Sequence, residues 1–79
     1  MTNTPLLERL IKGSGLKLAF IAEKLGISRQ ALHRKIKGLV QFTGPEIKTM
    51  CKLLNLNDWA EIEPVFFADN VDKNVYAAG

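Results

Sequence analysis

The sequence predicts a small all-α protein, a compact bundle of about five short helices. Apolar residues recur at intervals of three and four along successive segments, which is the period of a helix with one buried face. Several of these segments are preceded by N-cap residues and followed by glycine, as helices in folded proteins are. The chain has 79 residues, of which 47% are hydrophobic and 24% charged, which fits a single folded domain.

The first half of the chain contains three closely spaced helical patterns. They cover about residues 5–12, 17–25 and 29–37. Thr4 is the expected N-cap of the first, and Gly13 is its expected stop. Gly26 ends the second, and Ser28 is a good N-cap for the third. The three helices are therefore joined by short turns.

Two more helices are predicted in the second half, over about residues 44–55 and 58–63. Thr43 and Glu46 have the spacing of a capping box, in which each side chain bonds the other residue's backbone amide. Asn57 is the expected N-cap of the last helix, and Pro64 should break or kink it. Residues 65–67 could then form a short extended segment.

Several classes of function are disfavoured. Cys51 is the only cysteine and His33 the only histidine, so neither a disulfide nor a cysteine-based zinc site can form within the chain. No nucleophile lies in an activating motif, and no apolar run reaches the roughly 18 residues of a membrane span. The N-terminus lacks the pattern of a secretion signal. We therefore expect a cytoplasmic protein that is not an enzyme, with no cofactor, metal, membrane or evident small-molecule ligand.

Charge is distributed unevenly along the chain. Residues 1–52 carry ten Lys and Arg against three acidic residues, a net charge of +7. Residues 53–79 carry one Lys against five acidic residues, a net charge of −4. A basic body suggests a polyanionic partner on one face, although an ordinary solvated mixture of charges would look similar.

The stretch between Ile21 and Gly38 has the spacing of a helix-turn-helix. Ala22 is small where two helices would cross, and Gly26 stands four residues later, where the turn requires a positive φ. Ile27 would fill the angle between the helices. Leu32 would pack the following helix back onto the first.

This stretch resembles the helix-turn-helix of lambda-type phage repressors and Cro proteins, the Xre-like family. The small Cro-like repressors of phages from Gram-positive bacteria are the most similar in pattern. The matching residues are Ala22, Gly26, Ile27, Ser28, Leu32 and Gly38. The resemblance implies a lambda repressor-like domain over residues 1–68, followed by a polar, flexible tail over residues 69–79. The family often has glutamine where Leu18 stands, a hydroxyl N-cap where Lys17 stands, and an apolar residue where Lys35 stands.

The third predicted helix carries a polar arc. At 100° per residue, the polar residues of this helix share one arc, opposite Ala31 and Leu32. They are Arg29, Gln30, His33, Arg34 and Lys37. The resemblance implies that double-stranded DNA is the partner and that the arc reads bases through Arg29, Gln30, His33 and Arg34. The expected phosphate contacts are Lys17, Ser28, Lys35, Lys37, Thr43 and Gly44. Without the resemblance, the same arc could be a solvated helix face.

An apolar cluster near the end of the predicted domain suggests a homodimer. It consists of Trp59, Ile62, Val65, Phe66 and Phe67. Some of this apolar area must cover the core, and packing of the whole cluster in the core is one reading. A small core could not easily cover all five, however, and exposed apolar patches usually mark an interface. The resemblance implies a transcriptional regulator that binds an inverted repeat as a dimer. The alternative is a protein-interaction module, such as an anti-repressor or accessory subunit, that works through this acidic, aromatic surface.

Overall fold

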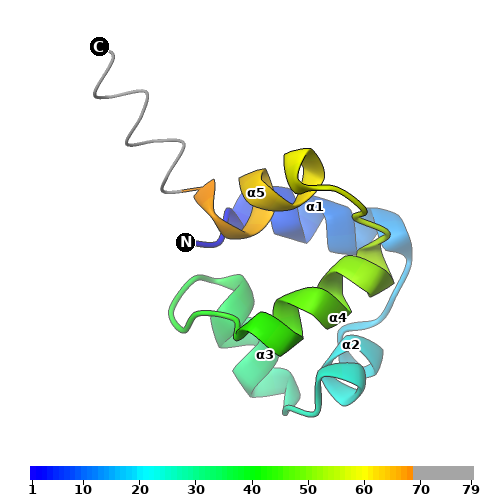
Figure 1. Cartoon of the computed structure of the whole chain (residues 1–79). Coiled ribbons are helices and arrows are strands. Elements are labelled where there is room, and N and C mark those ends of the chain that lie inside the picture. Colours follow the sequence, from blue (N-terminus) through cyan, green and yellow to red (C-terminus); the bar gives the residue numbers. More distant parts are fainter. Residues whose placement is uncertain (69–79) are drawn as a thin grey trace.

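Helices account for most of residues 1–68, the part of the chain that the computed structural model describes (Figure 1). Their bounds are α1 Thr4–Ser14, α2 Leu18–Leu25, α3 Arg29–Ile36, α4 Gly44–Leu54 and α5 Trp59–Phe66. No strand occurs in this part of the chain. The predicted all-α class is therefore confirmed. The predicted tail over residues 69–79 lies outside the described residues.

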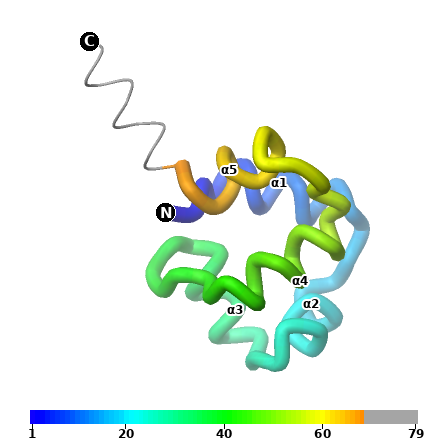
Figure 2. The backbone as a smooth tube through the Cα atoms, viewed as in Figure 1, coloured from blue at the N-terminus to red at the C-terminus, as the bar shows by residue number. Residues whose placement is uncertain are grey.

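The helix α4 runs through the centre of the bundle (Figures 1 and 2). The helices α1 and α5 lie together on one side of it, and α2 and α3 lie on the other. Each helix contributes one fully buried side chain to the shared core. These are Leu7, Ile21, Leu32, Met50 and Val65, in chain order. The core thus holds all five helices together, and α3 is fixed by packing on one side while its other side faces outward.

Local signals predicted the start of α4 correctly. The amide of Glu46 donates to the Thr43 hydroxyl oxygen over 3.3 Å, and the amide of Thr43 donates to the Glu46 carboxylate over 2.9 Å. The predicted capping box is therefore confirmed. Because these bonds satisfy helix-end amides that would otherwise lack partners, the helix begins at a defined residue.

Two predicted N-caps are wrong by one residue. Asn3, rather than Thr4, caps α1, accepting a hydrogen bond from the amide of Leu6. The Thr4 hydroxyl instead donates to the carbonyl of Ile36 over 2.6 Å, which ties the start of α1 to the end of α3. Asp58, rather than Asn57, caps α5. In both places two capping residues are adjacent, so sequence alone does not select between them.

The predicted end of the last helix is also wrong. Pro64 lies inside α5, and the helix continues to Phe66 instead of giving way to an extended segment. The proline removes one amide that would bond the carbonyl of Ala60, but Ala60 is exposed and that carbonyl can bond water. Val65 and Phe66 are 1% and 4% exposed, so continuing the helix buries both side chains. This burial outweighs the lost hydrogen bond.

Candidate nucleic-acid interface

The turn between α2 and α3 has the geometry that the sequence predicted. Gly26 adopts φ 74°, a left-handed conformation that costs other residues energy, and α2 ends there. The amide of Ile27 donates to the carbonyl of Ala22 over 3.0 Å. Ser28 then caps α3 by accepting from the amide of Ala31 over 3.0 Å. The two helices therefore form a helix-turn-helix, with Leu32 buried beneath α3.

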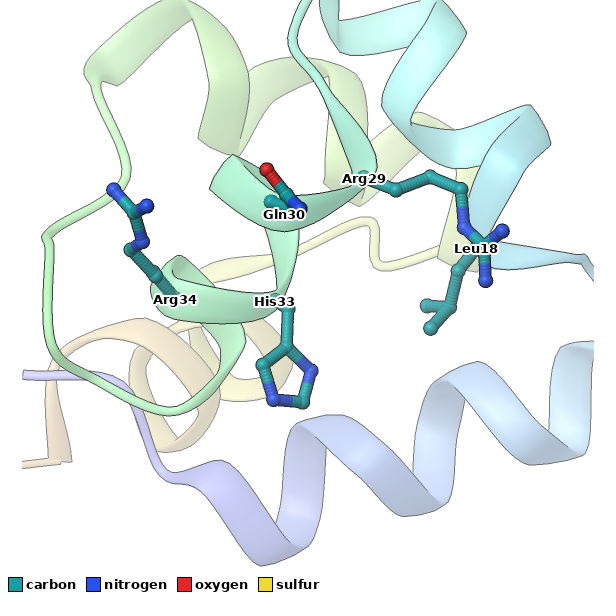
Figure 3. Close-up of a pocket in the computed structure, with 5 residues that line it drawn as sticks. All are labelled: Leu18, Arg29, Gln30, His33 and Arg34. Carbon is teal, nitrogen blue, oxygen red and sulfur yellow. The ribbon is translucent and has the colours of Figure 1, made fainter.

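The outer side of α3 brings together the four residues predicted to read bases. All four are exposed, and with Leu18 they line one open groove of about 660 Å³ (Figure 3). Arg29 and Arg34 extend in opposite directions along the groove, and His33 points toward α1 (Figure 3). Among residues 1–68, none of these four side chains forms a hydrogen bond or ion pair. Their polar groups are therefore available to a ligand without breaking an internal bond.

Lys35 has a different environment from the one expected of a phosphate contact. It is only 9% exposed, and its ammonium lies 2.7 Å from the Glu46 carboxylate. It also donates to the carbonyl of Gln41 over 3.3 Å. A side chain that is buried and paired in this way is not presented to a DNA backbone. Lys35 directly follows Arg34 of the exposed arc, but its side chain bonds Glu46 of α4, so it joins α3 to α4 instead.

Glu46 is held in its charged form. Burial alone would raise its pKa, but hydrogen bonds from Lys35 and Thr43 and the positive charge of Lys35 outweigh that effect. The pKa of Glu46 therefore lies below its ordinary value of 4.5. One carboxylate thus both caps α4 and pairs with α3, so it fixes the relative position of the two helices.

The other expected phosphate contacts lie at helix ends. Lys37 follows α3 and pairs with Glu8 over 2.9 Å, and both side chains are nearly half exposed. Lys17 stands at the N-cap of α2 and makes no capping bond, so the first amides of that helix have no side-chain acceptor. Exposed amides at a helix start favour an anion. Ser28, Thr43 and Gly44 lie at the exposed starts of α3 and α4.

The structure divides the apolar cluster that was expected to form a dimer. Val65 and Phe66 belong to the core, where Phe66 packs edge to face with Phe42 at 5.5 Å between ring centroids. Trp59 is 56% exposed, and the centroid of its ring lies 5.2 Å from that of the Phe67 ring. Half-buried Ile62 joins these two beside a groove of about 440 Å³ between α4 and α5. Only part of the predicted cluster is therefore available to a partner.

Sequence reasoning missed three features of the surface. Leu18 lines the groove on α3, although the sequence indicated only that it stands where the family often has glutamine. Leu39 and Val40 are 75% and 46% exposed in the loop after α3, and no sequence signal marked them. Ile47 of α4 lines the groove beside Trp59 of α5. The sequence does not indicate this, because it depends on where α5 lies relative to α4.

The described residues show neither a metal-binding cluster nor a membrane-crossing helix. No group of three or more His, Cys, Asp or Glu is placed to hold an ion in residues 1–68. None of the helices there is long and apolar enough to cross a bilayer. The single cysteine, Cys51, is buried in the core, and burial raises the pKa of its thiol.

Comparison with known proteins identifies the fold family. The family model of the HTH domain matches residues 4–54, which include α1 to α4 and the whole helix-turn-helix. No curated protein and no solved structure matched the chain. The match concerns HTH domains in general, so the resemblance to phage Cro proteins and repressors stays a prediction. The chain belongs to the helix-turn-helix (HTH) domain family.

Proposed function

We propose that this protein is a sequence-specific transcriptional regulator that inserts α3 into the major groove of DNA. Its HTH family membership indicates a DNA-binding regulator. One observation supports the finer statement most strongly. Four side chains suited to base edges line one open groove on α3 and have no partners among residues 1–68. A solvated helix face needs no such concentration of donors.

The side chains of the groove match the chemistry of base pairs. Arginine can grip guanine O6 and N7 with two hydrogen bonds, and glutamine can grip adenine N6 and N7. Arg29, Arg34 and Gln30 can each make one such pair, worth about 1–3 kcal/mol of discrimination. His33 can donate to or accept from a base or a phosphate. The groove thus offers enough contacts to read a short half-site.

Phosphate contacts would position α3 over the bases. Lys17, with the first amides of α2, is one candidate, and the starts of α3 and α4 at Ser28, Thr43 and Gly44 are others. Lys37 would have to leave or share Glu8 to reach a phosphate. Each phosphate neutralised should contribute roughly −0.9 to the slope of log affinity against log salt concentration.

A second copy of the chain is the proposed occupant of the groove between α4 and α5. One recognition helix reads few base pairs, and HTH proteins double the site by binding two half-sites about 34 Å apart. The two helices have opposite charge, because Lys48 and Lys52 lie on α4 whereas Glu61 and Glu63 lie on α5. In a two-fold dimer, α4 of one copy would meet α5 of the other, so these charges would be complementary.

The resemblance to Cro-like repressors supports the class of regulator. A protein of that class acts in the bacterial cytoplasm by occupying an operator, and we place this chain there on the strength of the resemblance.

Selection from a randomised duplex pool at near-physiological salt tests the proposal. An inverted repeat with half-sites about one helical turn apart should be enriched, and binding to it should weaken steeply with salt. Enrichment of no sequence, together with little salt dependence, would refute the proposal. That outcome would favour the protein-interaction alternative, which would use the groove beside Trp59.

A further inference from the structure

Leu18 occupies an unusual place for an apolar side chain. It is the first residue of α2, is half-buried, and packs against the hydrophobic core. It also lines the groove on α3, where the other lining residues are Arg29, Gln30, His33 and Arg34 (Figure 3). Leu18 is therefore the one side chain lining this groove that cannot form a hydrogen bond.

The apolar surface at Leu18 continues beneath His33. A neighbouring cavity of about 260 Å³ is lined by both of these residues, by the apolar Ile11 and Ile36, and by the charged Glu8 and Lys12. Leu18 and His33 point toward the same side, that of α1 (Figure 3). The groove thus has an apolar edge next to a row of hydrogen-bonding groups. A ligand that fills it completely must present both kinds of surface.

Base pairs present only one apolar group in the major groove. Guanine, adenine and cytosine offer hydrogen-bond donors and acceptors there, whereas thymine adds a C5-methyl group. We propose that Leu18 is a specificity-determining residue that packs against the C5-methyl group of a thymine beside the base pairs read from α3. This inference rests on the proposed function, because it requires α3 to lie in the major groove.

The packing of Leu18 makes it suitable for this contact. Its attachment to the core limits its motion, so little side-chain entropy remains to be lost on binding. Arg29 and His33 line the same groove, so they can bond base edges while Leu18 contacts the methyl group. A contact with deoxyribose carbons instead would be equally apolar, but it would not depend on the base. The two contacts therefore differ in a way that can be measured.

The first test changes only the DNA and uses the unmodified protein. In a duplex enriched from the randomised pool, each thymine of the half-site is replaced in turn by deoxyuridine, which lacks the C5-methyl group. At one position, removing the methyl should weaken binding about fourfold, the effect expected for one buried methyl group. The remaining thymine positions should change little. Folding of the protein is not affected by this test.

The second test assigns the methyl effect to Leu18. The ratio of affinities for the thymine and deoxyuridine duplexes should fall to about one in Leu18→Ala and in Leu18→Gln, and it should persist in Leu18→Met. Leu25→Ala is the matched control, since Leu25 is a half-buried leucine of the same helix that does not line the groove. This control should keep the ratio even if its stability falls. If Leu18→Ala does not fold, the glutamine and methionine variants decide the outcome.

The possible results separate this inference from the proposed function. Failure to enrich any sequence would overturn both. Enrichment without a methyl effect at any thymine would overturn the role of Leu18 alone. A methyl effect that survives in Leu18→Ala or Leu18→Gln would also overturn it, because another residue would then contact the methyl group.

Discussion

The ion pair between Lys35 and Glu46 determines how firmly α3 is held against α4, and the substitution Lys35→Met tests its contribution. Methionine fills a similar volume, so the change removes the ammonium while leaving little cavity. What is lost is the charge-assisted bond at 2.7 Å and the hydrogen bond to the Gln41 carbonyl at 3.3 Å. Glu46 keeps its bond from the Thr43 amide.

The expected loss follows from the burial of the pair. The two side chains are only 11% and 12% exposed, and hydrogen bonds to charged groups in such places contribute about 1.5–3 kcal/mol. The free energy of unfolding should therefore fall by about 2 kcal/mol. For a domain of this size, Tm should fall by roughly 10 °C. Adding Glu46→Gln removes the unpaired charge but keeps a capping side chain, so part of the loss should be recovered.

Urea denaturation monitored by circular dichroism measures these differences. Lys37→Met is the matched control, because the pair between Lys37 and Glu8 is 44% and 47% exposed. That substitution should cost no more than about 1 kcal/mol. Equal losses for the two Lys→Met variants would refute the reasoning from burial. Strictly additive losses in the Lys35→Met and Glu46→Gln double variant would show that the pair is not coupled.

Three further predictions concern other parts of the domain. The pKa of Glu46 is lowered by folding, so its stabilisation is present above about pH 4.5 and disappears as pH falls through the lower folded value. Denaturation at several pH values should show this loss in the parent and less of it in Glu46→Gln; equal pH dependence would contradict it. Gly26→Ala should cost about 1–2 kcal/mol because φ is 74°, whereas Gly13→Ala inside α1 should stabilise by about 0.5–1 kcal/mol. Calorimetry that gave both alanine variants the same sign would be inconsistent with this backbone argument. Trp59→Ala should weaken self-association without unfolding the domain, and sedimentation equilibrium that showed unchanged association would exclude the proposed dimer surface.

Local chemical signals made much of the fold predictable. The capping box at Thr43 and Glu46 and the turn at Gly26 involve residues within five positions of one another, so their geometry follows from the sequence alone. The exposed side of α3 was predictable for the same reason. Once Leu32 is buried, helical periodicity places Gln30 and Arg34, each two positions from it, on the opposite side of the helix, away from the core.

Features that depend on distant contacts were not predictable. Lys35 lies inward because Glu46 and the Gln41 carbonyl meet it there, and that meeting depends on the path of the loop after α3. The helix α5 continues past Pro64 because Val65 and Phe66 reach the core. Their burial requires α5 to dock on α1, where the amide of Asn3 donates to the carbonyl of Val65 over 2.7 Å. No local pattern indicates that contact.

The central claim is that the polar groove on α3 reads bases, and repeating the duplex selection with groove variants tests it most directly. Arg29→Ala and Gln30→Ala should each lose preference at one or two positions of the enriched half-site while the inverted repeat persists. Arg9→Ala is the control for loss of positive charge, since Arg9 is exposed on α1 and does not line the groove. It should yield the parent sequence with slightly weaker binding. If both groove variants enriched the parent sequence with parent affinity, α3 would not be the reading helix.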